Sequence, residues 1–211
     1  MKHVLAVLAL SLAVPFGSRM QAQEAPDQGA AGQDPASQGS SSQDLVLSDF
    51  PAGLAQAPGW VWEGFADTVM GGNSSLASPG IVNTPAGPAY RMTGQVVTKG
   101  GGFIQVRLDH PAGRFDASTY TGVEVVLDAP PGGNYFVFLR TKDNLFPWSY
   151  YGALLDLPGD KQTIRLPWSA FEAKSTLRRS IRTDRLLNVA LVAAFKDFEP
   201  DLKIYRVSLY R

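Results

Sequence analysis

Hydrophobic and polar residues alternate with a period of two along most of the chain after Leu45, which predicts β-strands. In the segment 103–109, Ile104, Val106 and Leu108 alternate with polar residues, so one face of that strand should be buried. The same alternation predicts further strands at 122–129, 162–171 and 203–211.

Two other segments, 134–141 and 187–195, are apolar on nearly every position and are predicted to be central strands. Clusters of Gly and Pro separate the predicted strands, as turns require. No long amphipathic helix is evident, because the best candidate, 171–187, fits helical spacing poorly. Many short strands with this spacing predict an all-β domain, a β-sandwich covering residues 45–211.

The first 22 residues resemble a secretory signal peptide. Lys2 precedes an apolar run at 4–16, and a small residue, Ala22, follows it. The run is shorter than the roughly 20 residues that cross a bilayer. We therefore expect export to the periplasm or the cell exterior. The alternative is that the segment is retained and anchors the protein to the membrane.

Residues 23–44 are predicted to be a disordered linker. They contain Gln, Gly, Ala, Ser, Pro and acids, without an aromatic or β-branched residue, so they cannot form a packed core. The alternative to a passive linker is a tether that gives the domain reach.

Charge and composition exclude several classes of function. Two of the 19 basic residues leave with the signal and no acid does, so the mature chain has a net charge of 17 − 19 = −2. This balance argues against a nucleic-acid partner. The chain has no cysteine, and only His110 remains after the signal, so no thiolate or His-based metal site is expected and no cofactor is predicted.

Catalysis is not favoured by the residues present. No Gly-x-Ser-x-Gly motif accompanies His110. Paired carboxylates could hydrolyse a glycoside, and the candidates are Asp67, Glu124, Asp128, Asp143 and Asp156. Acids at strand ends usually serve as caps or are solvated, so we predict that the protein is not an enzyme.

An aromatic cluster at 146–151 has two interpretations. Alternation places Trp148 and Tyr150 on one face and Tyr151 on the other. Exposed, the first two rings would form a stacking platform for sugars or an anchor for a protein. Buried, they would be core, which is favoured because the run resembles a strand. The basic segment 174–185 is expected to be a solvated loop, with an acidic partner as the alternative.

The most unusual stretch is "DTVMGGNSS", 67–75. Its two glycines, Gly71 and Gly72, permit positive φ and close backbone approach. We predict that Asp67 pairs with Arg107 or Arg140, because a buried arginine needs a partner. The alternative is a binding loop that offers the polar atoms of this stretch to a ligand. The candidate residues of the motif are Asp67, Thr68, Met70, Gly71, Gly72 and Ser74.

These motifs together resemble the complex I intermediate-associated protein 30 family, over roughly 45–211. The stretch at 67–75 is similar to the family's signature, and "GGF", "YFVFLRT", "WSYY" and "LKIYRVSLYR" follow in the family's order. The resemblance implies a jelly-roll sandwich like galactose-binding domains and a non-enzymatic role in assembling respiratory complex I. That complex assembles on the side of the membrane opposite to an exported protein, so the role does not transfer directly.

We therefore predict an exported, monomeric module that binds a protein client in an assembly or chaperone-like role. That client could be a membrane or respiratory-complex subunit. The alternative partner is carbohydrate of the cell envelope, and a carboxylate-based glycoside-active enzyme is third. Trp148 and Tyr150 exposed on a hollowed face would favour sugar.

Overall fold

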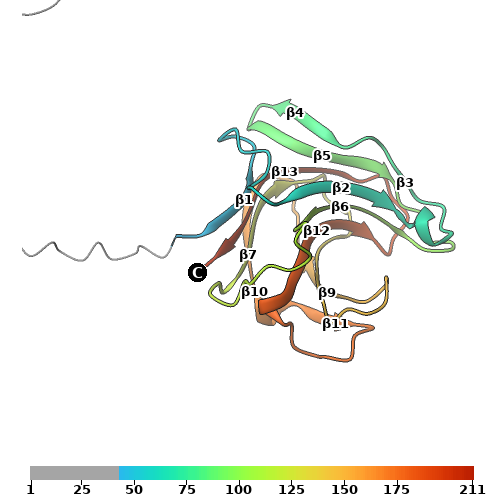
Figure 1. Cartoon of the computed structure of the whole chain (residues 1–211). Coiled ribbons are helices and arrows are strands. Elements are labelled where there is room, and N and C mark those ends of the chain that lie inside the picture. Colours follow the sequence, from blue (N-terminus) through green and yellow to red (C-terminus); the bar gives the residue numbers. More distant parts are fainter. Residues whose placement is uncertain (1–42) are drawn as a thin grey trace, which may run out of the picture. The chain divides into compact units, whose positions relative to one another are not determined.

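The computed structural model describes residues 43–211 (Figure 1). The predicted signal peptide and all but the last two residues of the predicted linker lie outside the described residues. Two antiparallel sheets form the described chain, together with three short 3-10 helices. Within 43–211, no helix has the length and apolar character needed to cross a membrane. The predicted all-β jelly-roll sandwich is confirmed.

The first sheet has seven strands. Five follow one another in the order β10 (Gln162–Pro167), β7 (Gly122–Asp128), β13 (Asp201–Tyr210), β5 (Gly87–Gln95) and β3 (Ser75–Leu76). Two more pair alongside, β1 (Leu45–Asp49) with β13 and β4 (Gly80–Thr84) with β5. The first and last strands of the domain are thus neighbours, which places the C-terminus next to β1 (Figure 1).

The second sheet has six strands and carries the site described below. Its order is β11 (Glu172–Lys174), β9 (Tyr150–Leu155), β8 (Tyr135–Thr141), β12 (Leu186–Ala194), β6 (Phe103–Asp109) and β2 (Val61–Ala66). The 3-10 helices are η1 (Asp67–Met70), η2 (Trp168–Ala170) and η3 (Thr183–Arg185). The prediction that 134–141 and 187–195 are central strands is confirmed, because β8 and β12 both lie inside this sheet.

The core lies between the two sheets and follows the predicted alternation. On β6, Ile104, Val106 and Leu108 are fully buried, while the residues between them are partly exposed. Burying apolar side chains in this way is the main stabilising term of the fold.

The outer face of the second sheet is apolar as well. On this face, Ala190, Val192 and Ala194 of β12 are buried beneath the larger rings of Phe103, Phe136 and Phe138. Small side chains on the central strand let rings from both neighbouring strands close over it. This explains why β8 and β12 are apolar on both faces, and it leaves an aromatic surface on the outside of the sandwich.

Candidate functional site

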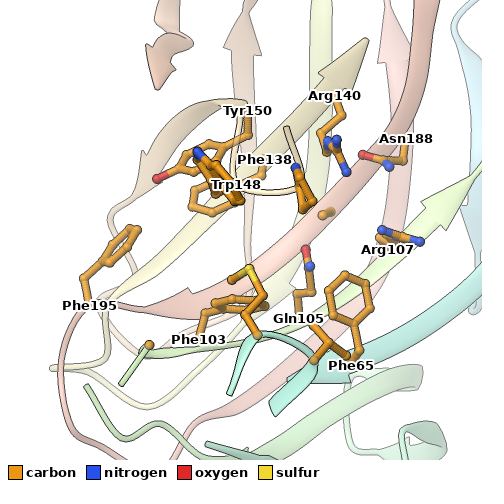
Figure 2. Close-up of a pocket in the computed structure, with 15 residues that line it drawn as sticks. Phe65, Phe103, Gln105, Arg107, Phe138, Arg140, Trp148, Tyr150, Asn188 and Phe195 are labelled. Atoms are coloured by element: carbon orange, nitrogen blue, oxygen red, sulfur yellow. The ribbon is translucent and has the colours of Figure 1, made fainter. Parts of the chain in front are cut away.

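The aromatic outer face of the second sheet is hollowed (Figure 2). The first hollow has a volume of about 550 Å³. It is lined by Phe65, Val69, Met70, Gly101, Phe103, Gln105, Arg107, Phe138, Arg140, Pro147, Trp148, Tyr150, Asn188, Ala190 and Phe195. Figure 2 shows the two arginines and Asn188 at one end and Phe195 at the other. The hollow therefore has a polar end and an aromatic end.

A pair of stacked rings forms one wall of the first hollow. Phe138 of β8 and Tyr150 of β9 lie with their centroids 3.9 Å apart and their planes at 16°. Gly152 lies opposite Phe138 in the strand register, and a Cβ there would approach both rings to 3.0 Å. The absence of a side chain at Gly152 thus leaves room for the stack.

Trp148 is exposed, so the favoured prediction that it belongs to the core is wrong. Its side chain is 55% exposed and stacks on Phe146, with ring centroids 5.3 Å apart. The strand begins only at Tyr150, because the residues before it form a loop. Tyr150 is half-buried, and Tyr151 on the opposite face is fully buried, as the alternation predicted.

The loop that carries Trp148 is held from beneath. The Arg140 Nη2 atom donates to the carbonyls of Asn144 and Phe146, at 3.3 and 3.1 Å. The Ser149 hydroxyl also donates to the Phe146 carbonyl, at 2.8 Å. The ring of Trp148 is therefore presented by a loop with defined anchors.

A second hollow of about 400 Å³ continues the first across β9. Phe138, Tyr150 and Phe195 line both hollows. The second hollow reaches the sheet edge, where Lys174 pairs with Glu172 at 3.0 Å. The two hollows are thus adjacent, with the stacked rings between them, and together they are called the groove.

Arg107 lies at the polar end and is fully paired. Its Nη2 atom lies 2.9 Å from a Glu63 oxygen and its Nε atom contacts Asp109. Asn188 donates to the other Asp109 oxygen at 3.0 Å. Both planar groups, of Arg107 and Asn188, are fixed by their neighbours.

Asp67 does not pair with an arginine, so that prediction is wrong. Its carboxylate accepts hydrogen bonds from the Ser74 backbone N–H and hydroxyl, both at 2.8 Å, and from the backbone N–H groups of Gly102 and Phe103. Backbone donors replace the arginine because β6 begins beside the loop. Burial raises the pKa of Asp67, but the bonds from Gly102, Ser74 and Phe103 outweigh it and lower the pKa below its usual value.

Two glycines make room for this carboxylate, Gly72 in the motif and Gly101 in the segment before β6. A Cβ at Gly72 or at Gly101 would overlap the Asp67 side chain. Gly71 has a different task, because it ends η1 in the left-handed conformation with φ of 85°. The motif is thus a structural clasp, and it sets the rim of the first hollow through the exposed Val69 and Met70.

The predicted site residues fall into two groups. Met70, Arg107, Arg140, Trp148 and Tyr150 line the first hollow. Asp67, Gly72 and Ser74 belong to the clasp, while Thr68 and Gly71 are exposed beside it. Sequence reasoning missed several lining residues: Phe65, Phe103, Gln105, Phe138, Asn188 and Phe195. The signal that could have found Phe138 and Phe195 is the aromatic content of segments that are apolar on both faces, and no such signal marks the others.

The carboxylates considered for catalysis lie elsewhere. Glu124 pairs with Arg165, Asp128 with Lys203, and Asp143 with Arg178. None of the acids proposed for catalysis lines the first hollow. Within residues 43–211, no group of three or more potential metal ligands is found. His110 packs against Trp60, with ring centroids 5.2 Å apart.

The fold is similar to solved carbohydrate-binding modules of Clostridium thermocellum. A family 11 module in complex with a β-1,3-1,4-mixed-linked tetrasaccharide aligns with a TM-score of 0.59 and 13% identity, over 79% of this chain and 95% of that one. A family 30 module of a cellulosomal cellulase aligns with a TM-score of 0.54 and 13% identity, over 79% and 96%. This likeness shows the fold alone.

Sequence comparison adds the family. The chain matches no curated protein significantly. The family model described as Complex I intermediate-associated protein 30 matches residues 55–196, well over half of the chain, and includes the Asp67 clasp and every residue that lines the two hollows. The chain therefore belongs to the Complex I intermediate-associated protein 30 family.

Proposed function

We propose that this domain is a non-catalytic carbohydrate-binding module, and that its ligand lies in the groove on the outer face of the second sheet. The observation that carries the proposal is the exposure of Trp148 beside the stacked rings of Phe138 and Tyr150. Flat rings offer sugars an apolar face for stacking, and planar polar groups beside them orient the hydroxyls.

The polar end of the groove supports this choice. Gln105, Arg107 and Asn188 present amide and guanidinium groups to the first hollow. Arg107 and Asn188 are held by neighbouring side chains, so they lose little conformational entropy when a ligand binds. Such a mixture of rings and fixed donors suits a ligand with both apolar faces and hydroxyl groups.

The adjacency of the two hollows favours an extended saccharide. Phe138, Tyr150 and Phe195 line both, so a chain long enough to enter both hollows would contact the same rings from each side. The related solved modules are named for carbohydrate binding, which guides the choice of probes. An exported module with this groove would meet glycans of the cell envelope or the surroundings, in line with the signal predicted at 1–22.

The test is a glycan array followed by calorimetric titration of the best binders. We expect at least one extended glycan to bind, and Trp148→Ala to weaken it roughly tenfold or more. Ile81→Ala is the matched control, because Ile81 is 59% exposed on β4 of the other sheet. Equal binding by the Trp148→Ala variant, or no binding to any glycan, would reject the proposal.

A protein client is the second candidate. Two exposed apolar side chains of one loop, Leu145 and Phe146, support it, as does Leu177, which is 91% exposed. The loop that contains Leu145 and the loop that contains Leu177 are joined by an ion pair between Asp143 and Arg178, at 3.4 Å. An exposed apolar patch of this kind is typical of protein contact sites. Family membership adds weight, since the family is named for association with a complex I intermediate.

Two variants, Trp148→Ala and Leu177→Ala, distinguish the two candidates when each is tested for co-purifying proteins and for glycan binding. The tagged protein is purified gently from native membranes, and co-purifying proteins are measured against the untagged control by quantitative mass spectrometry. A client that is retained by Trp148→Ala but lost by Leu177→Ala would support the protein candidate. A glycan bound by the Leu177→Ala variant and lost by Trp148→Ala would support the carbohydrate proposal.

A further inference from the structure

The first hollow is lined by cations but by no carboxylate. Its charged lining residues are Arg107 and Arg140, and its other ionisable group is Tyr150. The remaining lining groups are apolar side chains, backbone and neutral amides. A ligand in this hollow therefore meets positive charge and no negative side chain.

The two arginines differ in how they are paired. Arg107 contacts both Glu63 and Asp109. Arg140 forms no ion pair with any acid of the described chain, and its Nη2 donates only to two carbonyls. Its Nε atom is buried and has no hydrogen-bond partner among residues 43–211. A half-buried guanidinium with unused donors is costly unless something satisfies them.

Asp109 is the acid that could compensate Arg140, but it is already engaged. Its two oxygens accept from Arg107 and from Asn188. Neither Asp109 nor Glu63 lines the hollow. Burial and the neighbouring Arg107 lower the pKa of Arg140, and Asp109 offsets this only in part, which agrees with a cation lacking a full counter-charge.

We propose that the groove binds anionic saccharides, in which a carboxylate or sulfate group of a sugar contacts Arg140. This inference rests on the proposed carbohydrate-binding function. A guanidinium donates charge-assisted hydrogen bonds to both anions, and the Nη1 group of Arg140 has no hydrogen-bond partner among residues 43–211. Arg140 also holds the loop of Trp148, so the stacking ring and the cation keep a fixed relationship. A sugar stacked on Trp148 would have its charged substituent near Arg140.

The test compares charged with uncharged saccharides, and the galacturonate pair differs only in the methyl esters that remove its charge. Tetragalacturonate, its fully methyl-esterified form, a sulfated carrageenan tetrasaccharide and neutral cellotetraose are titrated calorimetrically against the whole domain. We expect at least one anionic ligand to bind roughly tenfold more tightly than its uncharged counterparts, and this advantage to shrink at high salt. Preference for the galacturonate or for the sulfated ligand identifies the anion.

Variants assign the effect to Arg140. Arg140→Gln should lower affinity for the anionic ligand to that of the neutral one, and Arg140→Lys should retain part of the preference because it keeps the charge. Arg114→Gln is the control, since Arg114 is exposed and lies outside both hollows. Thermal melting verifies that each variant is folded.

The outcomes distinguish the two proposals. Equal binding of charged and neutral ligands, still sensitive to Trp148→Ala, would overturn the anionic inference and leave the carbohydrate-binding function standing. An equal loss of both ligands in Arg140→Gln, without rescue by Arg140→Lys, would also overturn it, because Arg140 would then act only through the loop. Binding of none of these saccharides, when the array finds another glycan that binds, would overturn the anionic inference alone. No binding to any glycan on the array would remove the proposed function as well.

Discussion

Phe138 and Tyr150 stack face to face on adjacent strands, with centroids 3.9 Å apart, and they form the wall shared by both hollows. The stack depends on Gly152, which leaves the space beside it empty. A ligand that occupies either hollow therefore touches the same two rings.

Gly152→Ala should disturb this stack without unfolding the domain. The added methyl group would lie 3.0 Å from both rings, so the rings must shift by a few tenths of an ångström. We expect saccharide affinity to fall about three- to tenfold and the free energy of unfolding to change by about 1 kcal/mol. Titration and thermal melting measure the two effects. Unchanged affinity would show that the stack is not part of the site.

Asp67→Asn should destabilise the domain in a pH-dependent way. The variant loses charge-assisted bonds from Ser74, Gly102 and Phe103. We expect a loss of about 3 kcal/mol, or a melting temperature lower by about 6–12 °C, at neutral pH. Because the pKa of Asp67 is lowered on folding, its contribution is complete above the unfolded pKa of about 3.9 and disappears as pH falls through the lower folded value.

Melting curves of wild type and Asp67→Asn over a range of pH check this sign. The difference should be constant between about pH 6 and 8 and shrink below about pH 4. A ligand-binding role for Asp67 predicts the opposite pattern, with equal melting temperatures and lost binding.

The two glycines of the clasp should respond differently to alanine. Gly72→Ala would force the Asp67 carboxylate away from its donors, because the new Cβ would overlap it. Gly71→Ala meets no atom within 4 Å and carries only the strain of positive φ, about 1–2 kcal/mol. We expect Gly72→Ala to cost more, about 3 kcal/mol or above. Denaturant unfolding measures both, and the reverse order would refute the assigned roles.

Trp148 should report ligand binding through its fluorescence. Among the four tryptophans, Trp60 is buried, Trp62 and Trp168 are partly buried, and Trp148 is exposed. A bound saccharide should shift emission to shorter wavelength and protect against acrylamide quenching. Trp148→Phe should still bind, since a ring remains, but should lose this signal. A signal that persists in Trp148→Phe would place the ligand elsewhere.

The fold could be predicted from the sequence because the alternation of apolar and polar side chains indicates which face of each strand is buried. The inward residues of β6, Ile104, Val106 and Leu108, are the ones the pattern predicted to be buried. The same pattern could not show that the second apolar face of β8 would stay partly open. Burial of Phe136 and Phe138 depends on what covers the sheet, which a single strand does not reveal.

The site was predicted only in part for a similar reason. The sequence predicted a structural partner for Asp67 but assigned it an arginine, because backbone donors beside β6 cannot be recognised from residue identities. Trp148 was placed in the core because "WSYY" alternates like a strand, whereas the strand starts two residues later. Gln105 and Asn188 were missed because only the pairing of β6 with β12 brings their strands side by side on the outer face.

Most rings of the groove project from paired strands, and this has a consequence for recognition. Phe103, Phe138 and Tyr150 stand on β6, β8 and β9, so their separations are fixed by the strand spacing of about 4.8 Å together with the register of the hydrogen-bonded ladder. Should the groove bind a polymer, these rigid ring positions would select its repeat. Units whose spacing matches the rings would make a contact at each ring, and units of another spacing would not.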